Sequence, residues 1–144
     1  MTDLHCHILP AIDDGAKNAK VSMELLRMQN DAGVTDIVCT PHFNPDSQNL
    51  EDFIDKRYRS ARYLADYVFR SELPVRLKFG AEVRISPTIL DLDFLPLCFQ
   101  KTKVMLLEMP RTLRPQWDTN VIYQLTLGGV IPLIAHIERY PYVQ

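Results

Sequence analysis

The stretch VTDIVCT, residues 34–40, decides the expected fold. It is a nearly continuous apolar run, which is typical of a strand buried on both faces of a parallel sheet. Residues 17–32 before it have the apolar spacing of a helix, and Gly33 stands where a glycine commonly ends one. The apolar positions of that predicted helix are Val21, Leu25, Met28 and Ala32. A helix followed closely by a buried strand indicates an α/β fold.

Apolar runs and helical patterns alternate along the rest of the chain. The runs predict further strands at residues 3–8, 75–83, 103–109 and 130–136. Helical spacing and helix-end residues predict helices at residues 50–71, 86–92 and 117–127. The apolar face of the long helix consists of Phe53, Ile54, Tyr58, Ala61, Leu64, Ala65 and Val68. Strands that alternate with helices predict βαβ units and a parallel sheet.

The composition predicts one globular domain over residues 1–144. Hydrophobic residues make up 47% of the chain and charged residues 24%, and the formal net charge is -2. This charge argues against a nucleic-acid partner, because nucleic-acid-binding proteins carry basic patches. No run approaches the roughly 20 apolar residues that span a bilayer, and no signal peptide is visible. We therefore expect a cytoplasmic protein without membrane insertion, and leave an oligomer open.

The cysteines do not predict a catalytic thiol. They are Cys6, Cys39 and Cys98. Cysteine phosphatases carry an arginine six positions after the nucleophile, within a loop that binds phosphate. The corresponding positions here hold Ile12, Pro45 and Val104. An odd and widely spaced set also argues against a disulfide framework, so we expect buried free thiols.

All four histidines and several carboxylates stand at the ends of predicted strands or just after them. They are His5, His7, Asp13 and Asp14 for the first strand, His42 for the second, Glu82 for the third, Glu108 for the fourth and His136 for the fifth. Because functional sites of parallel α/β folds lie at the carboxyl ends of the strands, we expect these side chains to converge. His5 and His7 are two residues apart, so they share one face of an extended segment and can bind one ion.

Carboxylates within apolar strands need a cationic partner, because a buried charge loses its hydration. A divalent metal ion is such a partner, and imidazole with carboxylate is a ligand set for Zn, Mn, Fe or Ni. Simpler structural roles stay open, since a histidine such as His42 can also cap an element or fill a core. The alternative ion pairs are Glu82 with Arg84 or Lys78, Glu108 with Arg111, and Arg139 with Glu138.

Five ordered motifs resemble a known family. They are DLHCHILPAIDDGA (residues 3–16), CTPHFN (39–44), GAEVRI (80–85), LLEMP (106–110) and IPLIAHIERYP (131–141). The set resembles the polymerase-and-histidinol-phosphatase (PHP) superfamily. More narrowly, it is similar to the manganese-dependent protein-tyrosine phosphatases of Gram-positive capsular and exopolysaccharide operons. The resemblance extends over the whole chain.

The resemblance implies a fold, a metal site and a substrate. The fold would be a distorted (β/α)7 TIM-like barrel of the PHP type, and the site would hold two or three Mn2+ ions, with Fe or Zn as alternatives. The implied ligands are His5, His7, Asp14, His42, Glu82, Glu108 and His136. Arg139 would contact the phosphate, Asp14 would also act in catalysis, and Asp13 would orient a histidine. The substrate would be phosphotyrosine on a bacterial tyrosine kinase of polysaccharide assembly.

The chain also departs from the family pattern. Cys6 stands where the family usually has Ser, and Ile137 replaces a common Pro. Only about five β/α units are expected here, and the family's last Asp-x-His ligand pair has no counterpart, so we expect an N-terminal portion with low activity of its own. Two other functions stay open. One is a phosphatase of histidinol phosphate or another small phosphomonoester, and the other is an inactive metal-binding or scaffold fragment.

Overall fold

The computed structural model describes residues 1–143 and divides them into two compact units. The first unit, which we call the N-unit, contains Met1–Pro41 and Glu51–Phe79. The second, the C-unit, contains His42–Leu50 and the described residues from Gly80 onward. Among residues 1–143, no helix has the length and apolar character needed to cross a bilayer.

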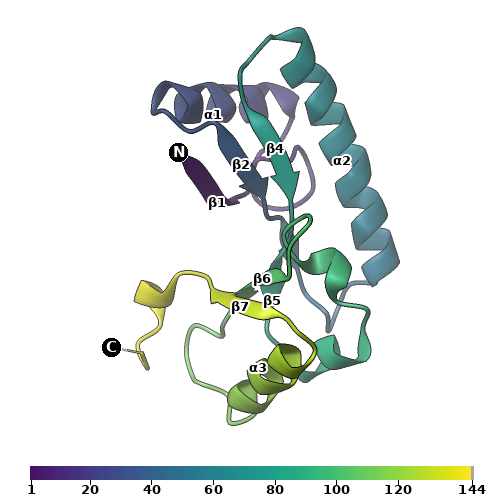
Figure 1. The fold of residues 1–144 in the computed structure, drawn as a ribbon, viewed down its shortest axis with the longest axis vertical. Coiled ribbons are helices and arrows are strands. Elements are labelled where there is room, and N and C mark those ends of the chain that lie inside the picture. The colour runs from purple at the N-terminus through teal and green to yellow at the C-terminus, as the bar shows by residue number, and fades with distance from the viewer. Residues whose placement is uncertain (144) are drawn as a thin grey trace. The chain divides into compact units, whose positions relative to one another are not determined.

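The N-unit is built on a parallel sheet of three strands. The strands are β1 (Thr2–Cys6), β2 (Asp36–Cys39) and β4 (Arg76–Phe79), in the order β1-β2-β4. Helices α1 (Ala19–Asp31) and α2 (Leu50–Arg70) complete the unit (Figure 1). Ile37 of β2, Leu26 of α1 and Leu64 of α2 belong to one buried cluster. The central strand β2 is buried on both faces, as the apolar run predicts.

Helix α1 turns a different face to the core from the one that the sequence predicts. The buried residues are Ala19, Ser22, Met23 and Leu26. Leu25 is 38% exposed and Met28 is 67% exposed, so the predicted apolar stripe is wrong. Both stripes have helical spacing, and spacing cannot choose between them. The ends are closer to expectation, because Asn18 caps the first turn and Gly33 follows the helix with a φ of 84°.

Helix α2 largely follows its prediction. Phe53, Ala61, Leu64 and Val68 are buried at helical spacing. Tyr58 and Ala65, which we expected on the same face, are exposed instead. The solvent face carries ion pairs one turn apart, from Arg59 to Asp55 and from Arg70 to Asp66.

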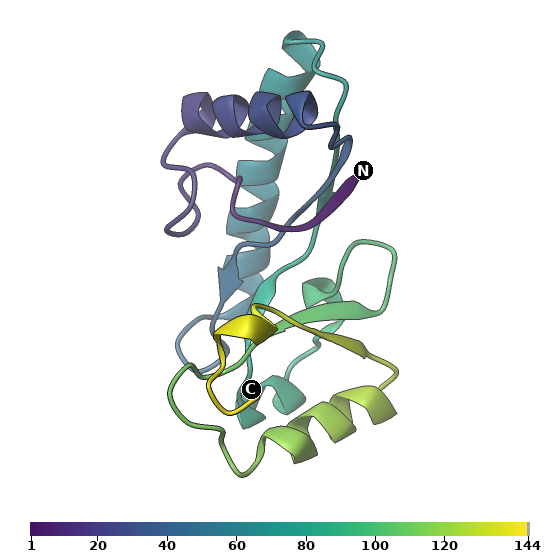
Figure 2. The ribbon, with the colours of Figure 1, turned by 90° about the vertical axis from the view of Figure 1, so that its left-hand side faces the viewer.

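The C-unit contains a second parallel sheet. Its strands are β3 (His42–Phe43), β5 (Glu82–Arg84), β6 (Val104–Glu108) and β7 (Ile131–Ile134), in the order β3-β5-β6-β7. Helix α3 (Asp118–Leu127) leads into β7, and Figure 2 shows the yellow turn η3 (Ile137–Arg139) that follows β7. The other short 3-10 helices are η1 (Pro87–Asp91) and η2 (Leu95–Leu97). The helix predicted at residues 86–92 is therefore present as a 3-10 turn, with Pro87 at its start.

The strand predicted over residues 75–83 is interrupted. It forms β4 and β5, which Gly80 and Ala81 separate, and the short strand β3 was not predicted at all. A Cβ atom at Gly80 would lie 2.7 Å from Cδ1 of Phe99, so the close packing of that ring requires glycine.

The parallel pairing confirms the α/β prediction. Residues 1–143 show two open sheets and not a closed barrel, and the single domain stays a prediction.

Candidate metal centre

Glu82 is the centre of a polar cluster within the C-unit. It begins β5, and its side chain is 0% exposed. Strand pairing places His42 of β3 opposite it, and His42 Nδ1 lies 3.3 Å from Glu82 Oε2. The other carboxylate oxygen, Oε1, lies 3.2 Å from Nε2 of His136. Both oxygens of this buried carboxylate therefore face an imidazole nitrogen.

Glu108 adds a second carboxylate to the cluster. It is the last residue of β6, and its Oε2 lies 4.0 Å from His42 Nδ1. One ligand atom from each of His42, Glu82 and Glu108 lies within 4.8 Å of the other two. Glu108 also contacts Arg111, since Nη2 of the arginine lies 3.4 Å from Glu108 Oε1. The ion pair that the sequence left open for Glu108 is thus present beside the cluster.

The recorded contacts of Glu82 differ from the alternative ion pairs that the sequence left open. It is fully buried, whereas Arg84 on the same strand is exposed. Lys78 lies 3.9 Å from Asp36 in the N-unit. The contacts of Glu82 in the C-unit include the imidazoles of His42 and His136, which suits a metal-ligand carboxylate.

His136 enters the cluster through an unusual backbone conformation. Its φ of 51° and ψ of 39° lie in the left-handed region, which costs a residue other than glycine about 1–2 kcal/mol. With this conformation the backbone turns away from the line of β7 and begins the turn η3. The imidazole of His136 then lies next to Glu82. Strain of this kind is often found at functional sites.

Arg139 lies at the end of η3 and is the arginine that the resemblance assigns to phosphate. Its side chain is 55% exposed, and Nε lies 3.5 Å from Oε1 of Glu138. The ion pair with Glu138 is therefore the contact that the structure records for it. An exposed pair of this kind contributes little to stability, so breaking it to turn the guanidinium toward another group costs little free energy.

The N-unit holds a second polar cluster on β1 and the loop after it. The Nε2 atoms of His5 and His7 lie 3.1 Å apart. His7 Nδ1 lies 2.9 Å from Asp13 Oδ2, and the other oxygen of Asp13 accepts the Gly15 N–H at 3.0 Å. Asp13 therefore orients the ring of His7, which leaves Nε2 directed toward His5. Asp14 is exposed beside it in the same loop.

The loop after β1 has little freedom at Gly15. The Ala16 N–H donates to the carbonyl of His7 at 3.0 Å. A Cβ atom at Gly15 would lie 2.2 Å from that same carbonyl oxygen and 2.5 Å from His7 Cβ. Only glycine fits this approach, so Gly15 helps to set the position of His7. Our sequence reasoning gave Gly15 no role, although it follows the Asp-Asp pair directly.

The donor atoms of both clusters suit a divalent ion. Imidazole nitrogen and carboxylate oxygen bind Mn, Fe and Zn in proteins, and a buried carboxylate such as Glu82 favours a cation beside it. In each unit, a carboxylate contacts a ring nitrogen of a candidate ligand and so fixes its orientation. We consider the two clusters separately, one in each unit.

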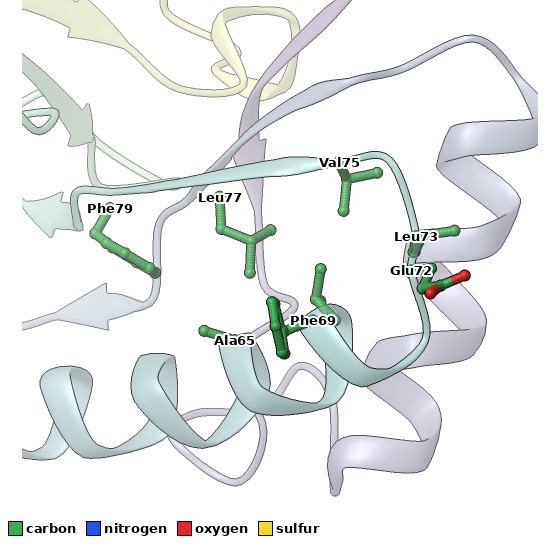
Figure 3. A pocket seen from close by; sticks show the side chains of 8 residues that line it. Ala65, Phe69, Glu72, Leu73, Val75, Leu77 and Phe79 are labelled. Carbon is green, nitrogen blue, oxygen red and sulfur yellow. The ribbon is translucent and has the colours of Figure 1, made fainter.

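One hollow of the N-unit is not part of either cluster. It has a volume of about 560 Å³ and lies between β4 and the C-terminal half of α2. Figure 3 shows Leu77 of β4, and Val75 just before that strand, pointing toward the helix, with Glu72 at one side. None of the candidate ligands lines it. An apolar hollow with one carboxylate offers no ligand set for a metal.

The three cysteines are buried free thiols, as predicted. Burial raises the pKa of Cys6 to about 12 and also raises the pKa of Cys39 and Cys98. A thiol of such high pKa is a poor nucleophile near neutral pH. Burial and raised pKa values therefore argue against cysteine chemistry as the basis of the site.

Parallel α/β sheets with histidine and carboxylate clusters define the chain as a candidate metal-binding α/β protein. Comparison with known families makes this specific. A model described as "Capsular polysaccharide synthesis, CpsB/CapC" matches residues 1–144. The chain belongs to this CpsB/CapC family, which confirms the resemblance noted in the sequence.

Individual relatives support the assignment. Tyrosine-protein phosphatase YwqE of Bacillus subtilis (strain 168) is 34% identical over 142 residues, which cover 96% of this chain and 55% of the relative. Tyrosine-protein phosphatase CpsB of Streptococcus agalactiae is 28% identical over 97% of this chain and 58% of the relative. The chain thus spans about half the length of the curated relatives it matches.

A solved structure matches the fold with a TM-score of 0.87 and 34% identity. It belongs to a study described as "Crystal structures of YwqE from Bacillus subtilis and CpsB from Streptococcus pneumoniae, unique metal-dependent tyrosine phosphatases". The match covers 99% of this chain and 58% of that one. Metal dependence is therefore a stated property of a protein with this fold.

Proposed function

We propose that the protein is a metal-dependent phosphomonoester hydrolase that removes phosphate from tyrosine in proteins. The observation that carries this proposal is the buried Glu82 carboxylate, which faces His42 and His136 and lies close to Glu108. Such a constellation suits a divalent cation and gives no cysteine or serine nucleophile. The names of the relatives and the metal dependence of the matched structure support the same activity.

The proposed ligands are the candidate residues of both clusters. They are His5, His7, Asp14, His42, Glu82, Glu108 and His136. We propose Mn2+ as the metal, in two or three sites, within a PHP-type barrel to which residues 1–144 contribute as a single domain. When bound, the ions would neutralise the phosphoryl oxygens and activate a water molecule for attack. Fe and Zn would fit the same donors.

The other residues act by orientation and charge. The Nδ1–H of His7 would donate a hydrogen bond to Asp13, so Nε2, which lies 3.1 Å from His5 Nε2, would be the ring nitrogen that binds a metal. Glu82 lies within 3.3 Å of a ring nitrogen of His42 and of His136, so its buried charge favours one orientation of each ring. Arg139 would leave its exposed pair with Glu138 and present two parallel N–H groups to the phosphate. Asp14, exposed beside Asp13, would complete the set from the first loop.

The proposed setting is capsular or exopolysaccharide synthesis in the cytoplasm. The matched family is described by capsular polysaccharide synthesis, and the relatives are named tyrosine-protein phosphatases. A phosphotyrosine phosphatase in such a system needs an enzyme that phosphorylates tyrosine. We therefore propose a tyrosine kinase of polysaccharide assembly as the partner and substrate.

Two substitutions test the site. His42→Ala and Glu108→Ala each remove a proposed ligand, and Glu24→Ala is the matched control, because Glu24 is exposed on α1. We expect the first two variants to lose Mn2+ content and at least about 90% of p-nitrophenyl phosphate turnover, in line with the cost of disturbing a metal site. The control should keep both. Full turnover and metal content in both ligand variants would end the metal-hydrolase proposal.

A comparison of substrates tests the tyrosine assignment. A phosphotyrosyl peptide and histidinol phosphate are offered to the same preparation, and kcat/KM is measured for each. We expect the peptide to be preferred. A clear preference for histidinol phosphate would keep the metal site but assign the protein to small phosphomonoesters.

A further inference from the structure

The segment after β7 returns to the end of β6 through the side chain of Tyr140. This residue is 1% exposed, and its hydroxyl oxygen accepts the Met109 N–H at 3.0 Å. Each of the two bonded residues directly follows a candidate site residue in the chain. Met109 follows Glu108, and Tyr140 follows Arg139. One hydrogen bond therefore joins the backbone next to a candidate ligand with the turn that carries the candidate phosphate-binding arginine.

Tyr142 makes a second tie beside the first. Its hydroxyl donates to the carbonyl of Pro110 at 2.5 Å. The rings of Tyr140 and Tyr142 stack, with centroids 5.7 Å apart and an interplanar angle of 16°. Two successive residues after Glu108 are thus bound by two tyrosines from the other segment, which limits how the end of β6 can move.

The turn η3 lies at the surface. None of its residues, Ile137–Arg139, is buried. Its backbone bonds are local, from the Arg139 N–H to the His136 carbonyl at 2.8 Å and from the Tyr140 N–H to the Ile137 carbonyl at 3.4 Å. The left-handed conformation of His136 is unfavourable without support. Tyr140 is the first buried side chain after this conformation, so it is the natural anchor of the turn.

The surroundings of the Tyr140 hydroxyl connect it to the cluster. The pKa of Tyr140 is raised from 10.0, mainly by burial, whereas the hydrogen bond from the Met109 N–H lowers it. The charges of Glu108 and Glu82 raise the pKa of Tyr140 further. The hydroxyl keeps its proton, and its oxygen remains available as the acceptor for the Met109 N–H.

We propose that Tyr140 is a positioning residue of the C-unit site. Its hydroxyl fixes the end of β6 with Glu108 against the turn with His136 and Arg139, so that these three side chains keep one arrangement. The consequence for metal and phosphate binding rests on the function proposed above. The consequence for backbone order does not depend on it.

The test removes the hydroxyl and keeps the ring. Tyr140→Phe retains the stacking with Tyr142 but leaves the Met109 N–H without its acceptor. Tyr123→Phe is the matched control, because Tyr123 loses the same hydroxyl from a 58% exposed position on α3. Amide hydrogen exchange is measured in the metal-free 144-residue chain, and Mn2+ affinity is measured by titration calorimetry.

We expect Tyr140→Phe to speed exchange at Met109 and Arg139 by about tenfold or more, as expected for local opening. We also expect it to weaken Mn2+ binding about tenfold, the lower end for a residue that supports a metal ligand. The control should change neither. Wild-type exchange at both amides would overturn the proposal, and so would a lower melting temperature with unchanged Mn2+ affinity.

Two further outcomes are informative. If the wild-type chain binds no Mn2+, the proposed function fails, and the exchange rates at Met109 and Arg139 alone decide the positioning role. If Tyr140→Phe does not fold, Tyr142→Phe replaces it, since that variant removes only the bond to Pro110. Tyr142→Phe should then speed exchange at Arg139, and an unchanged rate would overturn the proposal.

Discussion

His136 Nε2 lies 3.2 Å from Oε1 of Glu82, a carboxylate that is completely buried in the C-unit. The opposite oxygen faces His42 at 3.3 Å, so the carboxylate lies between an imidazole on β3 and one at the start of η3. Burial of this charge is costly for folding, and a site that keeps it gains binding capacity for a cation. Removing the charge should therefore weaken metal binding strongly but change the free energy of unfolding little or even raise it.

Glu82→Gln tests this opposition, because glutamine has nearly the same volume without the buried charge. We expect Mn2+ affinity to fall by at least about tenfold. We expect the free energy of unfolding of the metal-free chain to fall by less than about 1 kcal/mol, or to rise, since no carboxylate must be desolvated. Titration calorimetry and urea unfolding measure the two quantities. A loss above about 3 kcal/mol with unchanged Mn2+ affinity would show that Glu82 has a purely structural role.

Gly15→Ala tests the loop that positions His7. The added Cβ atom would meet His7 backbone and Cβ atoms at 2.2–2.9 Å, so the loop or the histidine must move. We expect a loss of about 1–3 kcal/mol in the free energy of unfolding, together with weaker Mn2+ binding. Chemical denaturation and calorimetry give both values.

Gly33→Ala is the matched control for that variant. No atom lies within 4 Å of its added Cβ, but its φ of +84° strains alanine. We expect a loss of about 1–2 kcal/mol without any change in Mn2+ binding. If both glycine variants keep full Mn2+ affinity, the close approach at Gly15 does not position His7.

Much of the fold could be predicted because short apolar runs in the sequence indicate buried parallel strands. The prediction failed where the choice depends on distant residues. Helix α1 has two stripes of equal spacing, and only packing selects the one with Met23 and Leu26. The break between β4 and β5 falls at Gly80 and Ala81, and Gly80 lies against the ring of Phe99, a contact that local sequence does not show.

In the candidate site, too, some features could be predicted from the sequence and others depend on distant residues. The rule for parallel strands needs only the order of the elements, and in the C-unit it places His42, Glu82 and Glu108 together. Their role as ligands stays a prediction. The left-handed turn at His136 has no comparable signal, since residues other than glycine uncommonly adopt a positive φ. The bond from Met109 to Tyr140 depends on that turn, so it could not be predicted either.

The cysteines give a prediction about chemical reactivity. With a pKa of about 12, Cys6 is thiolate to about one part in ten thousand at pH 8. We expect iodoacetamide at pH 8 to label the native chain slowly and to leave p-nitrophenyl phosphate turnover and Mn2+ content unchanged. The chain unfolded in guanidinium should react rapidly at all three thiols. Rapid labelling of the native chain with loss of turnover would contradict a metal-based reaction.

The pair of Asp36 and Arg76 predicts how the N-unit responds to acid. Arg76 Nε donates to Asp36 Oδ1 at 2.8 Å, and Nη2 donates to Oδ2 at 2.5 Å. These bonds are the main cause that lowers the pKa of Asp36 from 3.8 to about 2. Because the folded pKa lies below the unfolded one, the stabilisation is complete above about pH 4 and is lost as the pH falls toward 2.

Asp36→Asn measures this contribution through the melting temperature. The variant should melt below the wild type by a constant interval between pH 5 and pH 7, and the interval should shrink as the pH falls from 4 to 2. Asp66→Asn is the control, since Asp66 pairs with Arg70 on the exposed face of α2 and should change the melting temperature little at any pH. Circular dichroism gives the melting temperatures. An interval for Asp36→Asn that stays the same down to pH 2 would show that the charge pair does not stabilise the sheet.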